Sequence, residues 1–251
     1  MTQPTAAMLV IGDEILSGRT REGNAHHLAG VLTEIGVKLV EVRVVPDVRE
    51  EIIAAVQALS AKADTVFTSG GIGPTHDDIT AECVAAAFGA PIGVRDDARE
   101  ILETHYRETG RELNEARLRM ARIPEGAELI LNPVSAAPGF KIGNVHVMAG
   151  VPSVFQAMVE NVRPTLKGGP KVLSWSLRCE IGEGDLAGPL GETQLAFPDV
   201  SMGSYPFVTA TGVGSVLVLR HADRPRLEQA AVALRGALTP LGGPVSEAPP
   251  D

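Results

Sequence analysis

The segment TSGGIGPTHDDIT, residues 68–80, combines three glycines with two adjacent aspartates, Asp77 and Asp78. It is called the glycine segment below. It follows an apolar run and precedes an amphipathic run, which predicts a link from the end of a strand to the start of a helix. Free N–H groups and the helix dipole at such a link attract anions such as phosphate. The segment is not a Walker A motif, because no Lys-Ser or Lys-Thr follows the glycines. His76 stands in the third glycine position of the dinucleotide fingerprint.

The two aspartates would repel a bare phosphate, whereas a divalent cation between the charges would reverse that repulsion. Mg²⁺ commonly joins carboxylates to phosphates in this way. The pair therefore predicts a metal-bridged phosphate or pyrophosphate, with Asp77 and Asp78 as metal ligands. The alternative is that Asp78 is the N-cap of the following helix and that Asp77 interacts with the helix dipole. Considered alone, the pair gives the cap interpretation at least as much weight as the metal interpretation.

Two other predicted strand ends carry acidic residues. Asp13 and Glu14 directly follow the apolar run 6–12, and Asp47 follows the run 37–45. Because parallel strands end at one edge of a sheet, these carboxylates could meet the glycine segment and form a site for a hard cation. Asp13 could equally be a turn residue. Asp47, considered alone, is better explained as the first residue of a capping box with Glu50.

The strands and helices that would position these residues alternate along the first two-thirds of the chain. Strands are predicted over 6–12, 37–45 and 63–70, with helices over 24–36, 47–63 and 78–89. Two charged surface helices (95–110 and 111–124), three short strands (128–133, 139–143 and 144–150) and a helix over 151–166 follow. The pattern predicts an α/β fold with a mostly parallel sheet in a three-layer α/β/α domain.

A second, smaller α+β domain is predicted after the Gly- and Pro-rich segment KGGPK, which places the domains at 1–168 and 169–251. Its predicted order is strand (172–182), helix (184–197), two strands (199–207 and 214–221) and helix (223–238). The tail over 242–251 is expected to be frayed.

Composition excludes several classes of protein. The 251 residues carry a net charge of −9, so a dedicated nucleic-acid binder is not expected. No apolar run is long enough for a membrane span, and no Lys or Arg precedes the first apolar run as in a secretory signal. Cys83 and Cys179 are expected to be buried free thiols, and the protein is expected to be cytoplasmic. Zinc-binding and acyl-transfer signatures are absent from the sequence.

The motifs GDEILSG, Asn24, TSGGIGPTHDDIT, APGF and GVPS occur in an order that resembles the N-terminal portion of the CinA family (competence/damage-inducible protein A). That portion is similar to the molybdopterin-binding domain of the MogA and MoaB proteins. The resemblance covers about residues 6–166. The remaining residues look like the small KH-like domain of CinA proteins, and the C-terminal deamidase domain of full CinA proteins is expected to be missing.

The resemblance implies a ligand site on the rim of the sheet. Its phosphate side would comprise Gly70, Gly71, Gly73, Thr75, Asp78 and Thr80, with Asp13, Glu14, Asn24 and Asp47 across the cleft. The loops containing Pro138 and Gly139, and Gly150 and Pro152, would also let a ligand approach the backbone. The implied metal carboxylates are Asp47, Asp77 and Asp78, the implied base is Asp13 or Glu14, and Asp78 and Asp47 would take part in catalysis.

The leading functional hypothesis is a metal-dependent hydrolase of a nucleotide pyrophosphate such as ADP-ribose, using Mg²⁺, Mn²⁺ or Co²⁺, with K⁺ as an additional ion. The alternatives are a non-catalytic module that binds molybdopterin or a nucleotide, and a scaffold with a relic site. Homo-oligomers are expected from the family, and the size expected for this chain is a dimer.

Three residues depart from the family pattern, and two of them, Ala149 and Val154, favour the module to some degree. Ala149 replaces Pro and Val154 replaces Glu in the GVPS segment, and Ser135 replaces a glycine in NPVSAAPGF. The small domain lacks a basic RNA-binding G-x-x-G loop, because Gly188-Pro-Leu-Gly191 has no Lys or Arg in or beside it.

Overall fold

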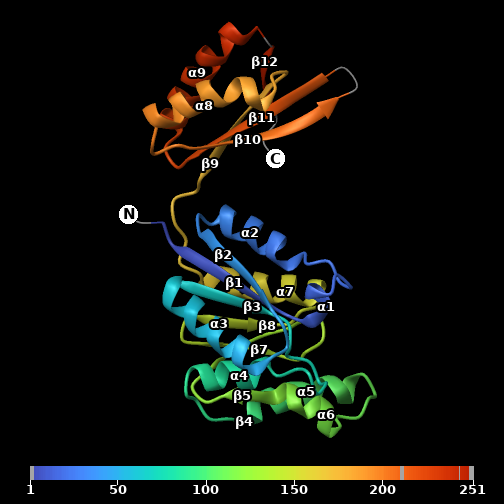
Figure 1. Cartoon of the computed structure of the whole chain (residues 1–251). Helices are drawn as coiled ribbons and strands as arrows, with labels where there is room; N and C mark the ends of the chain where they lie inside the picture. The colour runs from blue at the N-terminus through green and yellow to red at the C-terminus, as the bar shows by residue number, and fades with distance from the viewer. Residues whose placement is uncertain (1–2, 210–211, 243, 249–251) are drawn as a thin grey trace. The chain divides into compact units, whose positions relative to one another are not determined.

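The computed structural model describes residues 3–209, 212–242 and 244–248 (Figure 1). The chain divides into two compact units, Met1–Gly169 and Pro170–Asp251, and the division falls within KGGPK. None of the helices among the described residues is long and apolar enough to cross a membrane.

The first unit is built around a six-stranded sheet in the order β2-β1-β3-β8-β7-β6. The strands are β1 (Thr5–Ile11), β2 (Lys38–Val45), β3 (Thr65–Ser69), β6 (Glu128–Ile130), β7 (Gly139–Ile142) and β8 (Val145–Met148). The four strands from β2 to β8 are parallel, and β7 and β6 extend the sheet in antiparallel fashion. The predicted mostly parallel sheet is therefore confirmed.

Helices cover both faces of this sheet (Figure 1). On one face, α2 (Asn24–Glu34) and α7 (Pro152–Val162) enclose a core with Met8, Phe67 and Met148. On the other face, α3 (Arg49–Lys62), α4 (Thr80–Ala87) and α5 (Asp96–Glu108) share a core with Leu9 and Val147. Successive residues of a strand point to opposite faces, which is why one strand supplies both cores. The result is the predicted three-layer α/β/α arrangement.

The charged region 95–124 was predicted to form two surface helices, and its structure differs from this prediction. The helix α5 buries Ala98 and Leu102, and a short α6 (Glu115–Leu118) runs into a 3₁₀ turn, η1 (Arg119–Ala121). The chain then forms β5 (Arg122–Pro124), which pairs antiparallel with β4 (Ile92–Val94). Each of these strands has three residues, and three residues are too few for an alternating polar and apolar pattern to be recognised in the sequence.

The second unit contains an antiparallel sheet in the order β10-β11-β9-β12. Its elements are β9 (Leu173–Cys179), α8 (Glu183–Ala196), β10 (Ser201–Thr209), β11 (Gly212–His221), α9 (Arg224–Leu238), η3 (Thr239–Leu241) and β12 (Val245–Ala248). The predicted order of strands and helices is confirmed as far as α9. The prediction of a frayed tail is wrong for 245–248, which pair with β9, and 249–251 lie outside the described residues.

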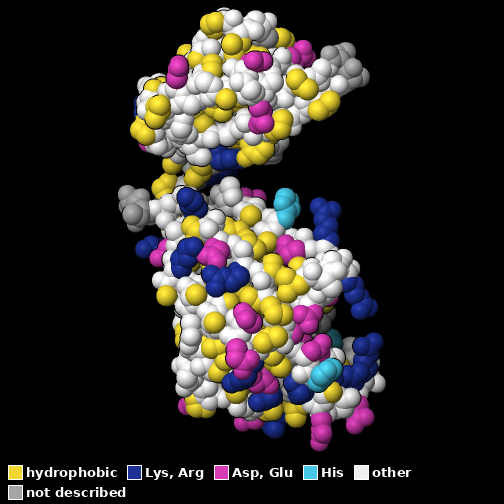
Figure 2. Space-filling view, viewed as in Figure 1, with side chains coloured by type: hydrophobic (Ala, Val, Ile, Leu, Met, Phe, Trp, Pro, Cys, Tyr) yellow, Lys and Arg dark blue, Asp and Glu magenta, His cyan; other side chains and the backbone are white. Residues whose placement is uncertain are grey.

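Both cysteines are buried free thiols, as predicted. The remaining short elements of the first unit are α1 (Asp13–Leu16), which follows β1, and η2 (Arg163–Thr165), which follows α7. On the face shown in Figure 2, Lys and Arg side chains of this unit are interspersed with Asp and Glu side chains.

Candidate functional site

The carboxyl ends of β1, β2, β3 and β8 lie together at one rim of the sheet. The N–H of Gly12 donates to the carbonyl of Val45 over 3.2 Å, and the N–H of Gly70 donates to the carbonyl of Met148 over 3.2 Å. These backbone hydrogen bonds join the loops that follow the four strands. The loops that contain Asp13, Asp47, the glycine segment and Gly150 are therefore neighbours, as the parallel order predicted.

The glycine segment approaches the neighbouring backbone too closely for larger residues. Gly70 has φ of 112°, and a Cβ there would lie 2.1 Å from the carbonyl oxygen of Ile11. A Cβ on Gly73 would lie 2.6 Å from the carboxylate of Asp78. In the described chain, the N–H groups of Gly71, Ile72 and Gly73 donate no hydrogen bond. These three N–H groups remain available to an anion.

Asp78 holds the loop closed and does not cap a helix. Its carboxylate accepts hydrogen bonds from the N–H of Thr75 at 2.8 Å and from the Thr75 hydroxyl at 2.5 Å. The helix α4 begins at Thr80, with Ile79 at its N-cap and no side-chain cap. The alternative interpretation of Asp78 as an N-cap is wrong. One carboxylate oxygen, Oδ2, accepts both bonds, so Oδ1 is left for other partners.

Asp47 is likewise not the start of a capping box. The helix α3 begins at Arg49 with Val48 at its N-cap, and the carboxylate of Asp47 accepts a 2.9 Å hydrogen bond from the N–H of Asp13. Partial burial raises the pKa of Asp47, and the negative charges of Asp13, Glu14 and Asp77 raise it further, against the hydrogen bond from Asp13. Asp47 thus stands in a concentration of negative charge at the rim.

This acidic group does not form a complete metal site by itself. Among the residues that the structure describes, no three His, Cys, Asp or Glu side chains are placed to hold one ion. The predicted set of Asp47, Asp77 and Asp78 therefore gives no preformed cage. Mg²⁺ is usually held by one or two carboxylates together with phosphates of the substrate. An ion held by these carboxylates would need further oxygen ligands beyond the side chains that the structure describes.

Asn24 organises a pocket on one side of the glycine segment. Its side-chain amide donates to the hydroxyl of Ser69 and to the carbonyl of Gly150, both at 2.8 Å. Asn24 is 5% exposed, and its Oδ1 is buried with no partner among the described residues. The pocket is lined by Glu14, Thr20, Asn24, Ser69, Gly150 and Pro152, among others. A buried acceptor of this kind can receive a hydrogen bond from a ligand.

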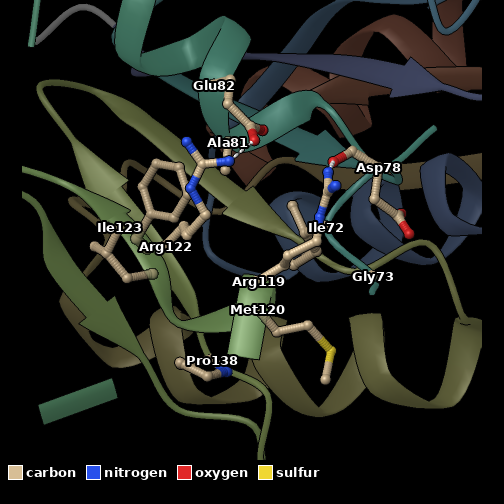
Figure 3. Close-up of a pocket in the computed structure, with 12 residues that line it drawn as sticks. Ile72, Gly73, Asp78, Ala81, Glu82, Arg119, Met120, Arg122, Ile123 and Pro138 are labelled. Atoms are coloured by element: carbon tan, nitrogen blue, oxygen red, sulfur yellow. Dashed lines mark hydrogen bonds and ion pairs between the residues drawn. The ribbon is translucent and has the colours of Figure 1, made fainter. Parts of the chain in front are cut away.

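A second pocket lies on the other side of the glycine segment (Figure 3). Gly71, Gly73 and Asp78 form one wall, and Arg119, Arg122 and Pro138 form another. The guanidinium of Arg119 lies 3.5 Å from the carbonyl oxygen of Asp78. Arg122 forms an ion pair with Glu82. Arg119 therefore places a positive charge beside the N–H groups of the loop.

The predicted site residues line two pockets, lie at the rim outside them, or pack behind the loops. Glu14, Asn24, Gly150 and Pro152 line one pocket, and Gly71, Gly73, Asp78 and Pro138 line the other. Asp13, Asp47, Thr75 and Asp77 lie around the rim outside both linings, and Thr80 is fully buried behind the loop. Gly139 and Gly70 serve close backbone packing, since a Cβ on Gly139 would lie 2.2 Å from the carbonyl oxygen of Val147.

Sequence reasoning missed Arg119, Arg122 and Ser69. The two arginines lie in a stretch that reads as a solvated helix, and no pattern in the sequence indicates that η1 and β5 return to the glycine segment. Ser69 carries a weaker signal, because it immediately precedes the glycines.

Comparisons with known proteins agree with this architecture. A family model described as probable molybdopterin binding domain matches residues 7–168, and one described as FAD synthase, middle domain, matches residues 171–242. The second match falls on the region expected to be KH-like. It is similar to the FAD synthase middle domain and is not a deamidase domain.

Relatives are found over nearly the whole chain. A protein from Pyrobaculum calidifontis is 34% identical over 247 residues, which cover 95% of this chain and 94% of the relative. A CinA-like protein from Citrifermentans bemidjiense is 35% identical over 93% of this chain, which spans 58% of that relative. The crystal structure of the protein CinA, of unknown function, from Thermoplasma acidophilum matches 65% of this chain and 98% of its own, with a TM-score of 0.59 and 34% identity.

Proposed function

The chain belongs to the CinA-like proteins of the probable molybdopterin binding domain family, and from this premise we propose that it binds a phosphate-bearing pterin or nucleotide at the rim. The observation that carries the proposal is the pocket in Figure 3, because Gly71, Ile72 and Gly73 line it together with Arg119. Among the described residues, the N–H groups of these three residues donate no hydrogen bond. Oriented N–H groups and an arginine are the groups with which proteins hold phosphate.

The pocket around Asn24 supports a ligand that is larger than inorganic phosphate. It lies across the glycine segment from Arg119, and it offers the buried Oδ1 of Asn24 and the backbone at Gly150. A ligand with a phosphate at the loop and a hydrogen-bonding ring or sugar beside it would use both pockets. Pterins and nucleotides have this composition.

A divalent cation fits the rim as a companion of the ligand. Asp47 and Asp77 supply carboxylates near one another, and the ligand's phosphate would supply the remaining oxygen atoms. A bound cation would neutralise phosphate charge and polarise a phosphoryl oxygen. The ion alone is therefore expected to bind weakly, and the ion with a phosphate ligand much more tightly.

Binding is tested by thermal stabilisation and calorimetry with ADP-ribose, AMP, molybdopterin and inorganic phosphate, each with and without Mg²⁺. We expect Arg119→Ala to weaken binding by about tenfold, which corresponds to about 1.4 kcal/mol. The matched control is Arg99→Ala, since Arg99 pairs with Asp96 and Glu103 on the surface of α5. Failure of every ligand to stabilise the protein, or equal binding by the two variants, would contradict the proposal.

Hydrolysis of a nucleotide pyrophosphate such as ADP-ribose is the second candidate function. The observation that favours it is the raised pKa of Asp47 beside Asp13 and Glu14, because carboxylates with perturbed pKa values are frequent where protons are transferred. In this reaction one water adds to a phosphorus atom, the phosphoanhydride bond breaks, and AMP and ribose 5-phosphate leave. Asp13 or Glu14 would take the proton of the water, and the loop N–H groups would stabilise the charge on phosphate.

The measurement is release of AMP from ADP-ribose with Mg²⁺, Mn²⁺ or Co²⁺, with K⁺ present, against a chelator control. Asp78→Ala, Asp47→Asn and Glu14→Gln should each reduce the rate by at least about a hundredfold if the residue acts in the reaction. Glu100→Gln, an exposed change on α5, should leave the rate unchanged. If a preparation binds ADP-ribose but releases no AMP, the hydrolase hypothesis is rejected and the hypothesis of a non-catalytic binding module remains.

A further inference from the structure

A row of side chains crosses four strands on the face of the sheet covered by α2 and α7. In the strand register, Phe67 of β3 lies beside His146 of β8, His146 beside Lys141 of β7, and Lys141 beside Glu128 of β6. Val145 and Val147 belong to the core on the opposite face, so His146 between them points toward α7. The row lies toward the amino end of β8, away from the rim.

A pocket of about 290 Å³ opens over this row. Ile130, Leu131 and Val162 give it apolar walls, and Lys141, His146 and Asn161 bring polar atoms to it. Its volume is close to the lower limit of about 300 Å³ for small-molecule sites. It shares no lining residue with either pocket beside the glycine segment.

His146 is an unusual residue for the centre of a sheet. It is 4% exposed, and its ring stacks on Phe67 with a centroid separation of 5.2 Å. Its Nδ1 is buried and has no hydrogen-bond partner among the described residues. A buried polar atom without a partner costs stability, whereas a phenylalanine at this position would stack equally well. Backbone groups of Val66 and Asn144 act on the ring and favour its charged form, but they leave Nδ1 without a hydrogen bond of good geometry among the described residues.

The charge state of the ring follows from its surroundings. Burial, with a contribution from the charge of Lys141, lowers the pKa of His146 to about 4. At neutral pH the ring is uncharged, with one nitrogen as a donor and the other as an acceptor. Lys141 and Glu128 are the other ionisable groups that line the pocket.

Lys141 is available to a ligand, while the neighbouring polar groups are already engaged. Its ammonium lies 3.9 Å from the carboxylate of Glu128, and their side chains are 37% and 78% exposed, so the pair is weak. The amide of Asn161 donates to the carbonyl of Leu131, and the hydroxyl of Thr165 donates to the carbonyl of Val162. The pocket therefore offers one ammonium, one neutral imidazole and apolar walls.

We propose that this pocket binds a small organic monocarboxylic acid. Its carboxylate would lie against Lys141 and His146, and its apolar body would contact Leu131 and Val162. A carboxylate carries one negative charge and is therefore repelled by Glu128 less strongly than a phosphate dianion would be. The proposal is independent of the rim, because it uses none of the residues assigned to phosphate binding there.

Titration with benzoate, followed by NMR of the protein with ¹³C-labelled histidine rings, tests the proposal. We expect the His146 ring resonance, assigned by its loss in His146→Phe, to shift saturably with a dissociation constant of about 1 mM. Lys141→Met should weaken binding at least about fivefold, because the pairing charge is lost. Lys62→Met is the control, since Lys62 pairs with Glu41 on another part of the surface. Benzyl alcohol and inorganic phosphate should give no saturable shift.

The variant His146→Phe separates this role from a structural one. We expect it to melt at the same temperature as the wild type or higher and to lose benzoate binding. The proposal is overturned if benzoate gives no saturable shift, if Lys141→Met binds as well as wild type, or if phosphate shifts the ring equally. ADP-ribose binding at the rim, measured in the same Lys141→Met protein, should be unchanged, so the two proposals succeed or fail separately.

Discussion

The side-chain amide of Asn24 donates a 2.8 Å hydrogen bond to the hydroxyl of Ser69, joining the first residue of α2 to the last residue of β3. The same amide also donates to the carbonyl of Gly150, just beyond β8. One buried side chain thus positions three elements that border a pocket, while its own carbonyl oxygen is left for a ligand.

Replacement of Asn24 by alanine should reduce both stability and ligand binding. The buried hydroxyl of Ser69 and the partly buried carbonyl of Gly150 would lose their donor, and an unsatisfied buried acceptor typically costs about 1–3 kcal/mol in the free energy of unfolding. Urea denaturation measures the loss. The matched control is Gln57→Ala, because the side chain of Gln57 makes an exposed 3.4 Å hydrogen bond to the carbonyl of Ala87. Equal stability of the two variants would show that the Asn24 contacts contribute little.

Gly70 and Gly30 should respond in opposite directions to alanine. A Cβ on Gly70 would collide with the Ile11 carbonyl at a positive φ, so we expect Gly70→Ala to destabilise the fold by more than about 1 kcal/mol. Gly30 lies in the interior of α2 with open space around its Cα, so Gly30→Ala should stabilise by about 0.5–1 kcal/mol. Thermal unfolding of both variants checks the pair, and a tolerated Gly70→Ala would contradict the collision.

Asp47→Asn should become more stable relative to wild type as pH rises. The folded pKa of Asp47 is raised above its unfolded value, so its contribution to stability is present at low pH and is lost as pH rises through the folded pKa. Asparagine removes this titration and keeps an acceptor for the N–H of Asp13. We expect the difference in free energy of unfolding, variant minus wild type, to increase between about pH 3 and about pH 7.

Asp64→Asn provides a control of opposite sign for this experiment. Hydrogen bonds from the hydroxyl and then the N–H of Thr5 lower the pKa of Asp64. Its contribution to stability is therefore present above the unfolded pKa and is lost as pH falls. Relative to wild type, Asp64→Asn should lose stability as pH rises. If the difference in free energy of unfolding from wild type changed with pH in the same direction for both variants, the assigned direction of one of the two pKa shifts would be wrong.

Ala136→Gly should stabilise the loop between β6 and β7. Ala136 has φ of 61°, a left-handed conformation that costs about 1 kcal/mol for a residue with a Cβ. The adjacent Ser135 accepts a 2.7 Å hydrogen bond from the amide of Asn132, which helps to hold the conformation. Glycine at 136 should raise the free energy of unfolding by a few tenths to about 1 kcal/mol. A matched Ala87→Gly change at the last residue of α4 should lower it instead.

Much of the fold follows from local patterns in the sequence. The buried strands β1 and β3 are short apolar runs that end at glycine, and helices such as α2 place apolar residues at helical spacing. These patterns arise from burial on both faces of the sheet, so they are strong wherever an element is long and central. They are weak in β4, β5 and β12, which are short or lie at an edge.

The site was less predictable than the fold because local chemistry allows several partners for one side chain. Asp47 and Asp78 are in favourable places for helix caps, yet their carboxylates bind the N–H of Asp13 and the Thr75 loop. Arg119 reaches the glycine segment because η1 and β5 pack beside it. No sequence pattern near Arg119 predicts this tertiary contact. Contacts between distant segments decide these cases, and a single sequence does not encode them as a pattern.

The backbone hydrogen bonds that join Gly12 to Val45 and Gly70 to Met148 connect parts of the chain that are remote in sequence. Closing such long loops is slow, so the rim should be completed late in folding, after the parallel strands have paired. A partly folded chain would then lack the closed form of the glycine segment. During refolding, the ligand should consequently bind only after the slowest step in assembly of the sheet. A bound ligand should also slow the unfolding of the unit Met1–Gly169.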